Sequence, residues 1–177
     1  MKAVAVLAVV AFAVLSLSVK NELRRERSPV AGLTVGQPMP GFTLKDLSGS
    51  DVSLDQVLKD NTVVAINFWA SWCGPCRLEM PGFENLYQKR HKDGFVILGI
   101  NEDQKPGEMA GYLHDRPVTF PVLLDPNGEL MQRLGLEALP TTILVGRNGK
   151  ILLVVQGVMP YLSAFIEAEL KNAQTAK

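Results

Sequence analysis

The stretch NFWASWCGPCRLEMP, residues 67–81, decides the fold, and it holds both cysteines of the chain, Cys73 and Cys76. The run that leads into it, TVVAINFWA, is rich in β-branched and aromatic residues, which is typical of a strand buried on both faces. After Cys73, apolar residues recur at helical spacing to about residue 92, with Pro81 inside the helix. The two thiols therefore lie where a buried strand is expected to end and a helix to begin.

Three chemistries are open to such a pair. A tetrahedral zinc site needs about four Cys or His ligands in paired spacing. The chain offers two cysteines, plus His91 and His114 without a partner motif, so both histidines are expected to be solvated and no metal is expected. As a structural staple, a four-residue loop would contribute about 2 kcal/mol, against about 3 kcal/mol for fifteen residues. The spacing therefore favours a bridge that opens and closes in thiol–disulfide exchange.

The expected position of the pair also assigns a role to each thiol. Cys73 would cap the helix N-terminus, where unpaired N–H groups and the positive end of the helix dipole favour a thiolate. A free thiol has a pKa of about 8.5, and lowering it makes the thiolate abundant at neutral pH. Cys76, one turn further along, would be the resolving thiol that attacks the mixed disulfide.

With these residues in view, the chain resembles the thioredoxin superfamily. WCGPC (residues 72–76) matches the thioredoxin active site in full, and LPTT (residues 139–142) resembles the loop whose cis-proline sits against the disulfide. The resemblance implies that Pro140 is cis and that the backbone of Leu139 pairs with a bound substrate chain.

A narrower resemblance covers about residues 36–170. The segments VGQPMPGFTLKDLSGSDVSL, FPVLLDPNGEL and LPTTILVGRNGKI, together with the cysteine motif, are similar to the membrane-anchored TlpA/ResA/CcmG-like thiol:disulfide oxidoreductases. Such proteins are exported and reduce disulfides outside the cytoplasm, notably in apocytochrome c. The resemblance implies a CcdA/DsbD-type membrane electron donor, Cys-containing exported substrates and no cofactor.

Two further positions near the motif are candidates for supporting roles. Thioredoxin has a buried Asp where this chain has Asn67, so Glu79 becomes the nearest candidate base for the resolving thiol, three residues after Cys76. The alternative is that Glu79 is a solvated acid near a helix N-terminus. Trp69 is expected to pack in the core, whereas Trp72 is expected to shield the disulfide and to form part of the docking surface.

The N-terminal segment at residues 3–19 carries no charge and would span about 25 Å as a helix. We expect an uncleaved membrane anchor at residues 1–20, with a cleaved signal peptide as the alternative. The flank at residues 20–27 is more basic than the start of the chain, which by the positive-inside rule favours the opposite orientation. Equal totals of 18 basic and 18 acidic residues, with no long basic run, do not suggest a nucleic-acid partner.

The rest of the pattern predicts the fold class. We expect an α/β, thioredoxin-like domain at residues 36–177, with a central mixed β-sheet flanked by helices and an N-terminal β-hairpin extension, after a linker at residues 21–35. Ser53 and Gln56 could form a capping box for a short helix, and Pro160 is expected in the first turn of the last helix.

Two other functions use the same fold. GQPMPGFTL also resembles peroxiredoxins, which suggests a thiol peroxidase, although that chemistry needs a lone peroxidatic cysteine in a Pro/Thr-rich loop. A copper-delivery module is the non-enzymatic alternative, but such modules use a longer Cys spacing with a distal His. A peroxide-consumption assay and metal analysis of the purified protein separate these from thiol–disulfide exchange.

Overall fold

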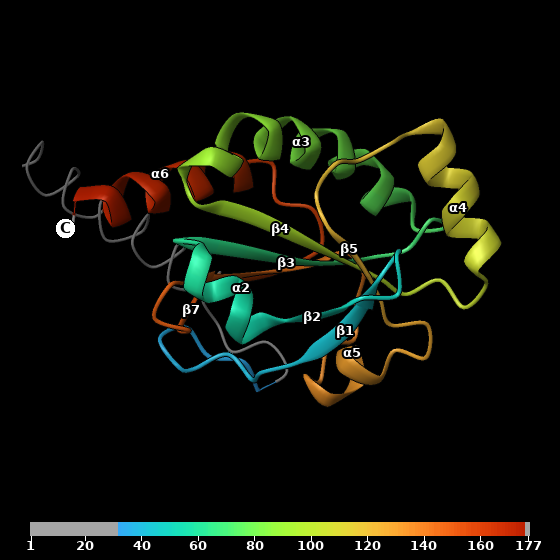
Figure 1. Cartoon of the computed structure of the whole chain (residues 1–177), viewed down its shortest axis with the longest axis horizontal. Helices are drawn as coiled ribbons and strands as arrows, with labels where there is room; N and C mark the ends of the chain where they lie inside the picture. Colours follow the sequence, from blue (N-terminus) through green and yellow to red (C-terminus); the bar gives the residue numbers. More distant parts are fainter. Residues whose placement is uncertain (1–31, 176–177) are drawn as a thin grey trace, which may run out of the picture.

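A computed structural model describes residues 32–175, in which one mixed sheet is flanked by helices (Figure 1). The elements in chain order are β1 (Thr43–Asp46), β2 (Asp51–Ser53), α2 (Leu54–Asp60), β3 (Val63–Trp69), α3 (Gly74–Arg90), the 3-10 turn η1 (His91–Asp93), β4 (Phe95–Asn101), α4 (Pro106–Asp115), β5 (Val122–Leu124), α5 (Glu129–Arg133), β6 (Thr141–Gly146), β7 (Ile151–Gln156) and α6 (Leu162–Thr175).

The seven strands lie in the order β2-β1-β5-β4-β3-β6-β7. Strand β3 is parallel to β4 and antiparallel to β6, and β4 is parallel to β5. The antiparallel β1–β2 pair joins the sheet through β5, at the edge opposite β7. This architecture confirms the predicted mixed sheet with an N-terminal hairpin extension.

Side chains of β3 alternate between two apolar layers, as the pleat of a strand requires. Val63, Ala65 and Trp69 face the layer that contains buried residues of α3, α4 and α6. Val64, Ile66 and Phe68 face the layer that contains residues of α2 and α5. Figure 1 shows α3 and α6 on one side of the sheet and α2 and α5 on the other. Because both faces are covered, every residue of β3 is buried.

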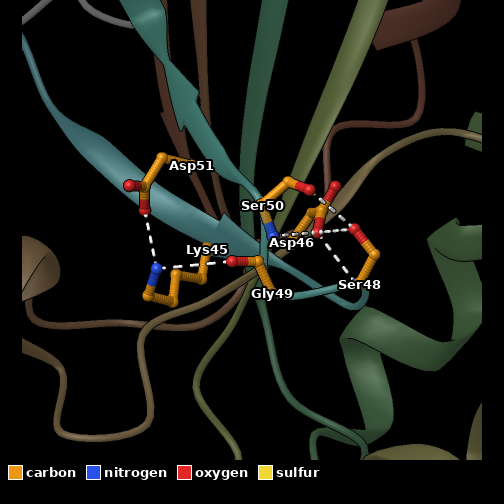
Figure 2. A network of polar contacts seen from close by, with 6 residues as sticks. All are labelled: Lys45, Asp46, Ser48, Gly49, Ser50 and Asp51. Atoms are coloured by element: carbon orange, nitrogen blue, oxygen red, sulfur yellow. Dashed lines mark hydrogen bonds and ion pairs between the residues drawn. The ribbon is translucent and has the colours of Figure 1, made fainter.

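The β1–β2 hairpin is held by polar contacts at its turn (Figure 2). The Asp46 carboxylate accepts hydrogen bonds from the Ser48 hydroxyl at 2.7 Å, the Ser48 amide at 2.8 Å and the Ser50 amide at 2.9 Å. These bonds, the one from the Ser48 hydroxyl first, lower the pKa of Asp46 below its usual value. Lys45 Nζ lies 3.0 Å from Asp51 Oδ1 across the two strands. Local side-chain bonds thus replace the ladder where the chain reverses.

Two predicted helix starts differ from the structure. Ser53 is the residue before α2, but its side chain makes no cap hydrogen bond, and the Leu54 amide instead donates to the Phe42 carbonyl at 3.0 Å. The capping box is therefore wrong. Helix α6 begins at Leu162, so Pro160 lies in the turn before it and not in its first turn.

The predicted anchor, with residues 21–31 of the predicted linker, lies outside the described residues. Leu33, near the end of that linker, is buried against the α2 and α5 side of the sheet. The Gly36 amide then donates to the Ile151 carbonyl at 2.8 Å. Among residues 32–175, no helix has the length and apolar character needed to cross a bilayer.

Gly99, in the middle of β4, predicts a stability effect. A Cβ atom at this position would lie 2.8 Å from Phe120 Cε2 and 3.2 Å from Trp69 Nε1, so two buried aromatic side chains would have to move. We expect Gly99→Ala to lower the free energy of unfolding by about 1–3 kcal/mol. Urea unfolding followed by far-UV circular dichroism measures the change.

Gly111 in α4 supplies the matched control, because no atom outside its chain neighbours and the backbone of α4 lies within 4 Å of a Cβ atom placed there. Gly111→Ala should leave stability unchanged or raise it by up to about 1 kcal/mol through helix propensity. A Gly99→Ala variant as stable as the wild type would contradict the packing argument.

Candidate active site

The cysteine motif lies between the end of β3 and the start of α3. The chain turns at residues 70–73, where the Cys73 amide donates to the Ala70 carbonyl at 3.1 Å. Cys73 is the N-cap residue of α3, and Gly74 and Pro75 form its first turn. Proline is tolerated there because a helix does not need the first N–H groups as donors. The motif thus occupies the strand-to-helix junction that the sequence predicted.

Cys73 and Cys76 form a disulfide, with their Cα atoms 5.3 Å apart. Cys73 is 5% exposed and Cys76 is fully buried. The Cys76 amide donates to Cys73 Sγ at 3.2 Å, so one N–H group of the first helical turn already points at this sulfur. An N–H donor in that position would also stabilise a thiolate on Cys73 after reduction.

The loop at Leu139 and Pro140 approaches the motif through strand pairing. The peptide bond between these residues is cis, as the resemblance implied. Thr141 pairs with Phe68 in the β3–β6 ladder, so the loop just before β6 lies beside the end of β3 and the turn that follows. Pro140 is buried, its carbonyl accepts from the Gly157 amide at 2.7 Å, and Leu139 is half-buried.

Glu79 of α3 forms a hydrogen bond with Asn67 of β3. Asn67 Nδ2 donates to Glu79 Oε1 at 2.9 Å and to Thr142 Oγ1 at 3.0 Å. Burial raises the pKa of the Glu79 carboxyl to about 7, and the hydrogen bond from Asn67 opposes that rise only in part. Glu79 is half-buried, and its carboxyl keeps its proton to higher pH than a solvated surface acid does.

The two tryptophans differ as expected. Trp69 is fully buried, and its ring centroid lies 5.5 Å from that of Tyr112. Trp72 is 65% exposed, which excludes a core position for it. An exposed indole next to the disulfide is available for contact with a partner. His91 and His114 are both exposed, as predicted.

Asp103, which no motif in the sequence singled out, contacts the cysteine turn from the loop after β4. Its carboxylate accepts from the Ser71 amide at 3.0 and 3.1 Å and from the Ser71 hydroxyl at 3.1 Å. The available signal was the polar run NEDQ directly after the buried strand GFVILGI. Polar residues at the carboxyl end of a parallel strand often serve a site at that edge.

The comparisons with known proteins agree with this geometry. The model of the AhpC/TSA family matches residues 35–154. The chain belongs to this family of thioredoxin-like proteins. The thiol-disulfide oxidoreductase ResA of Geobacillus thermodenitrificans is 34% identical over 134 residues, which cover 76% of this chain and 74% of that protein. The ResA of Bacillus subtilis is 32% identical over 127 residues, covering 72% and 70%.

Solved structures of this fold are also similar. A proposed thiol:disulfide interchange protein DsbE from Chlorobium tepidum is 35% identical, has a TM-score of 0.71, and is matched over 98% of its length and 80% of this chain. StoA from Bacillus subtilis is 26% identical, with a TM-score of 0.61 and coverage of 96% and 73%. This AhpC/TSA-family member is a thioredoxin-like thiol:disulfide oxidoreductase.

The raised pKa of Glu79 predicts a pH-dependent difference in stability. Below its ordinary pKa of 4.5, the carboxyl is neutral in both the folded and the unfolded protein. As the pH rises through about 7, folding must bury a charge that the unfolded chain keeps in water. We therefore expect the stability of the oxidised wild type, relative to Glu79→Gln, to be highest at low pH and to fall towards about pH 8.

Urea unfolding of both proteins at several pH values measures that difference. The Glu84→Gln variant is a suitable control, because hydrogen bonds from Thr119 and Gln88 hold the pKa of Glu84 below its usual value against the effect of burial. Its pH dependence should have the opposite sign, with wild-type stability rising relative to the variant as the carboxylate ionises. A Glu79→Gln difference that does not vary with pH would contradict the buried-acid interpretation.

Proposed function

We propose that Cys73 and Cys76 are the redox pair of an exported reductase that acts on disulfides in other exported proteins. The observation that carries the proposal is the Cys73–Cys76 disulfide at the N-terminus of α3, together with a cis Leu139-Pro140 loop that strand pairing places beside the end of β3. A bridge in that position closes a very short loop, so it adds little stability and is suited to exchange.

In the proposed reaction the Cys73 thiolate attacks one sulfur of a substrate disulfide. A mixed disulfide forms, and one substrate thiolate leaves. Cys76 then gives up its proton and attacks Cys73 Sγ, which releases the second substrate thiolate. Two electrons pass to the substrate, whose two thiolates then take up protons from water, while the proton of Cys76 goes to a nearby base. The Cys73–Cys76 disulfide remains in the enzyme.

Glu79 is the proposed acceptor for the Cys76 proton. A carboxyl with a pKa of about 7 is ionised often enough at neutral pH to accept a proton, and basic enough to hold it. Glu79 follows Cys76 by three residues on the same helix, which favours this role. The exposed Trp72 and the backbone of Leu139 are the proposed contacts for an extended substrate chain.

The proposed substrates include apocytochrome c before haem attachment, and the proposed electron source is a CcdA/DsbD-type membrane protein. The family resemblance and the similarity to ResA proteins support both partners. The apolar segment at residues 3–19 is the proposed anchor, with residues 21–35 as a linker and the domain at residues 36–177 outside the cytoplasm. A thiol peroxidase is disfavoured because both cysteines lie in one helix-terminal motif instead of a lone peroxidatic position.

A trapping experiment tests the redox pair and its partners. Only the second thiol can release the mixed disulfide, so Cys76→Ser should accumulate substrates covalently bound to Cys73 in cells. Non-reducing gels and mass spectrometry of the captured species should identify a c-type apocytochrome or a protein that handles one, together with the membrane donor.

The double variant Cys73→Ser/Cys76→Ser is the matched control and should capture nothing. Capture of the donor and unrelated exported proteins, without any cytochrome component, would remove the cytochrome role and leave the reductase. No capture by a folded Cys76→Ser protein would contradict the proposed redox pair.

A reporter fusion tests the orientation. Alkaline phosphatase joined after Lys177 should be active, because that enzyme needs disulfides that form outside the cytoplasm. In the control fusion, Val10→Arg and Val14→Arg each place a charge near the centre of the apolar segment, at a cost of about 3 kcal/mol per residue, and should abolish activity. An inactive but abundant wild-type fusion would favour the orientation indicated by the basic flank.

A further inference from the structure

Asp103 is a buried acid that binds Ser71 in the cysteine turn and Asn101 at the end of β4. It lies two residues beyond the end of β4 and is 3% exposed. Besides the Ser71 amide and hydroxyl, its carboxylate accepts from Asn101 Nδ2 at 2.9 Å. The Asp103 amide in turn donates to Asn101 Oδ1 at 3.2 Å. The side chain is therefore fixed from behind by Asn101 and binds Ser71 with both oxygens.

Ser71 lies two residues before Cys73, so a small shift of its backbone would also move the reacting sulfur. It is the second residue of the turn at residues 70–73, and the Cys73 amide closes that turn on the Ala70 carbonyl. Just before the turn, the end of β3 is bound to the loop after β4, because the Glu102 amide donates to the Trp69 carbonyl at 2.9 Å. Between these two attachments, the Asp103 bonds are the side-chain contacts that hold Ser71.

We propose that Asp103 is a positioning residue for thiol–disulfide exchange, because its carboxylate holds the turn that presents Trp72 and Cys73 at the start of α3. This inference rests on the proposed function, in which Cys73 is the attacking thiol. The hydrogen bonds of the Asp103 carboxylate go to Ser71 and Asn101 and not to the two sulfur atoms. It acts through Ser71, by keeping Cys73 Sγ in line with the N–H groups of the first turn of α3.

The bonds from Asp103 to Ser71 and the negative charge of Asp103 predict opposite effects on the reactivity of Cys73. A carboxylate near the turn disfavours a thiolate, so charge alone would make Cys73 more reactive at low pH once Asp103 is removed. Loss of the bonds to Ser71 would instead loosen the turn, weaken the alignment of the thiolate with the helix N-terminus and reduce its reactivity. The sign of the change therefore separates the two explanations.

The experiment measures the alkylation rate of Cys73 against pH in the reduced full-length protein, together with the rate of exchange with a peptide disulfide. In the wild type, Cys73 should titrate well below the pKa of about 8.5 of a free thiol. Asp103→Ala should move that titration upwards and slow exchange about tenfold. Asp103→Asn should stay closer to the wild type, because its amide oxygen can still accept from the Ser71 amide. Ser71→Ala, which keeps the amide donor and removes only the hydroxyl, should show a smaller loss than Asp103→Ala.

Asp125→Ala is the matched control. Asp125 is also 3% exposed, and its carboxylate accepts two backbone amides, Leu130 and Met131 at the start of α5, instead of Ser71. Its loss should lower stability by a similar amount and leave the Cys73 titration in place. An equal shift in Asp125→Ala would mean that general loosening explains the effect, and would overturn the inference.

Two further outcomes are decisive. Faster or unchanged alkylation in Asp103→Ala and Ser71→Ala, with a normal wild-type profile, would overturn the positioning role and leave the proposed function intact. If Asp103→Ala does not fold, Ser71→Ala decides the question alone. A wild-type Cys73 that reacts at the rate of free cysteine would contradict the proposed function itself.

Discussion

Strand β3 pairs with β4 over Val63–Trp69 and with β6 over Val63–Phe68, and these two ladders bring the surrounding loops to the cysteine motif. The β6 ladder sets Thr142 opposite Asn67 and brings the cis-proline loop beside the end of β3. The β4 ladder sets Asn101 opposite Trp69, so the loop that carries Asp103 meets the turn that carries Ser71. Two loops distant in sequence thus converge on the cysteine motif because both neighbouring strands are in register with β3.

Asn67 is the polar residue of β3, and it lies on the face of the strand that packs on α3. Asn67 falls between Ala65 and Trp69 on the face of β3 that packs on α3, where an apolar residue would otherwise be expected. Its amide reaches Glu79 and Thr142, while its Oδ1 atom is buried without a partner among the described residues. A buried amide of this kind orients the acid without supplying a charge, so the ionisation of Glu79 is governed mainly by desolvation.

Residues 101–103 form a second polar region, behind the cysteine turn. The Glu102 carboxyl is nearly buried, and burial followed by the nearby Asp125 carboxylate raises its pKa to about 8. Asp125 itself binds the first amides of α5, and its own amide donates to the Asn101 carbonyl at 2.9 Å. The loop after β4 is therefore tied to the cysteine turn on one side and to α5 on the other. The bonds from Asp103 to Ser71 give the cysteine turn its fixed geometry, whereas the Asp125 carboxylate binds only the α5 side of this region.

Local patterns in the sequence were enough to determine the buried strand, the helix that starts at Cys73, the hairpins and the layer order, because periodicity and turn residues act over a few neighbouring positions. The cis bond before Pro140 came from family resemblance, whereas the short spacing and helix-terminal position of the two cysteines already favoured thiol–disulfide exchange. Two predictions from local rules were wrong. The Leu54 amide donates to the Phe42 carbonyl instead of to the Ser53 side chain, and the last helix starts two residues after Pro160.

The sequence by itself singled out the residues that are proposed to carry the chemistry of this protein: two thiols at a helix start, an acid one turn beyond, and a proline loop far along the chain. Only the tertiary structure decided that Glu79 is half-buried against Asn67 and that Asp103 holds Ser71. The burial and the hydrogen-bond partners of a side chain depend on strands that lie far apart in the sequence. Ser71 and Asp103, for example, are 32 residues apart and form a hydrogen bond. No pattern within a short window contains that information, because the partner that sets each side chain's environment lies outside it.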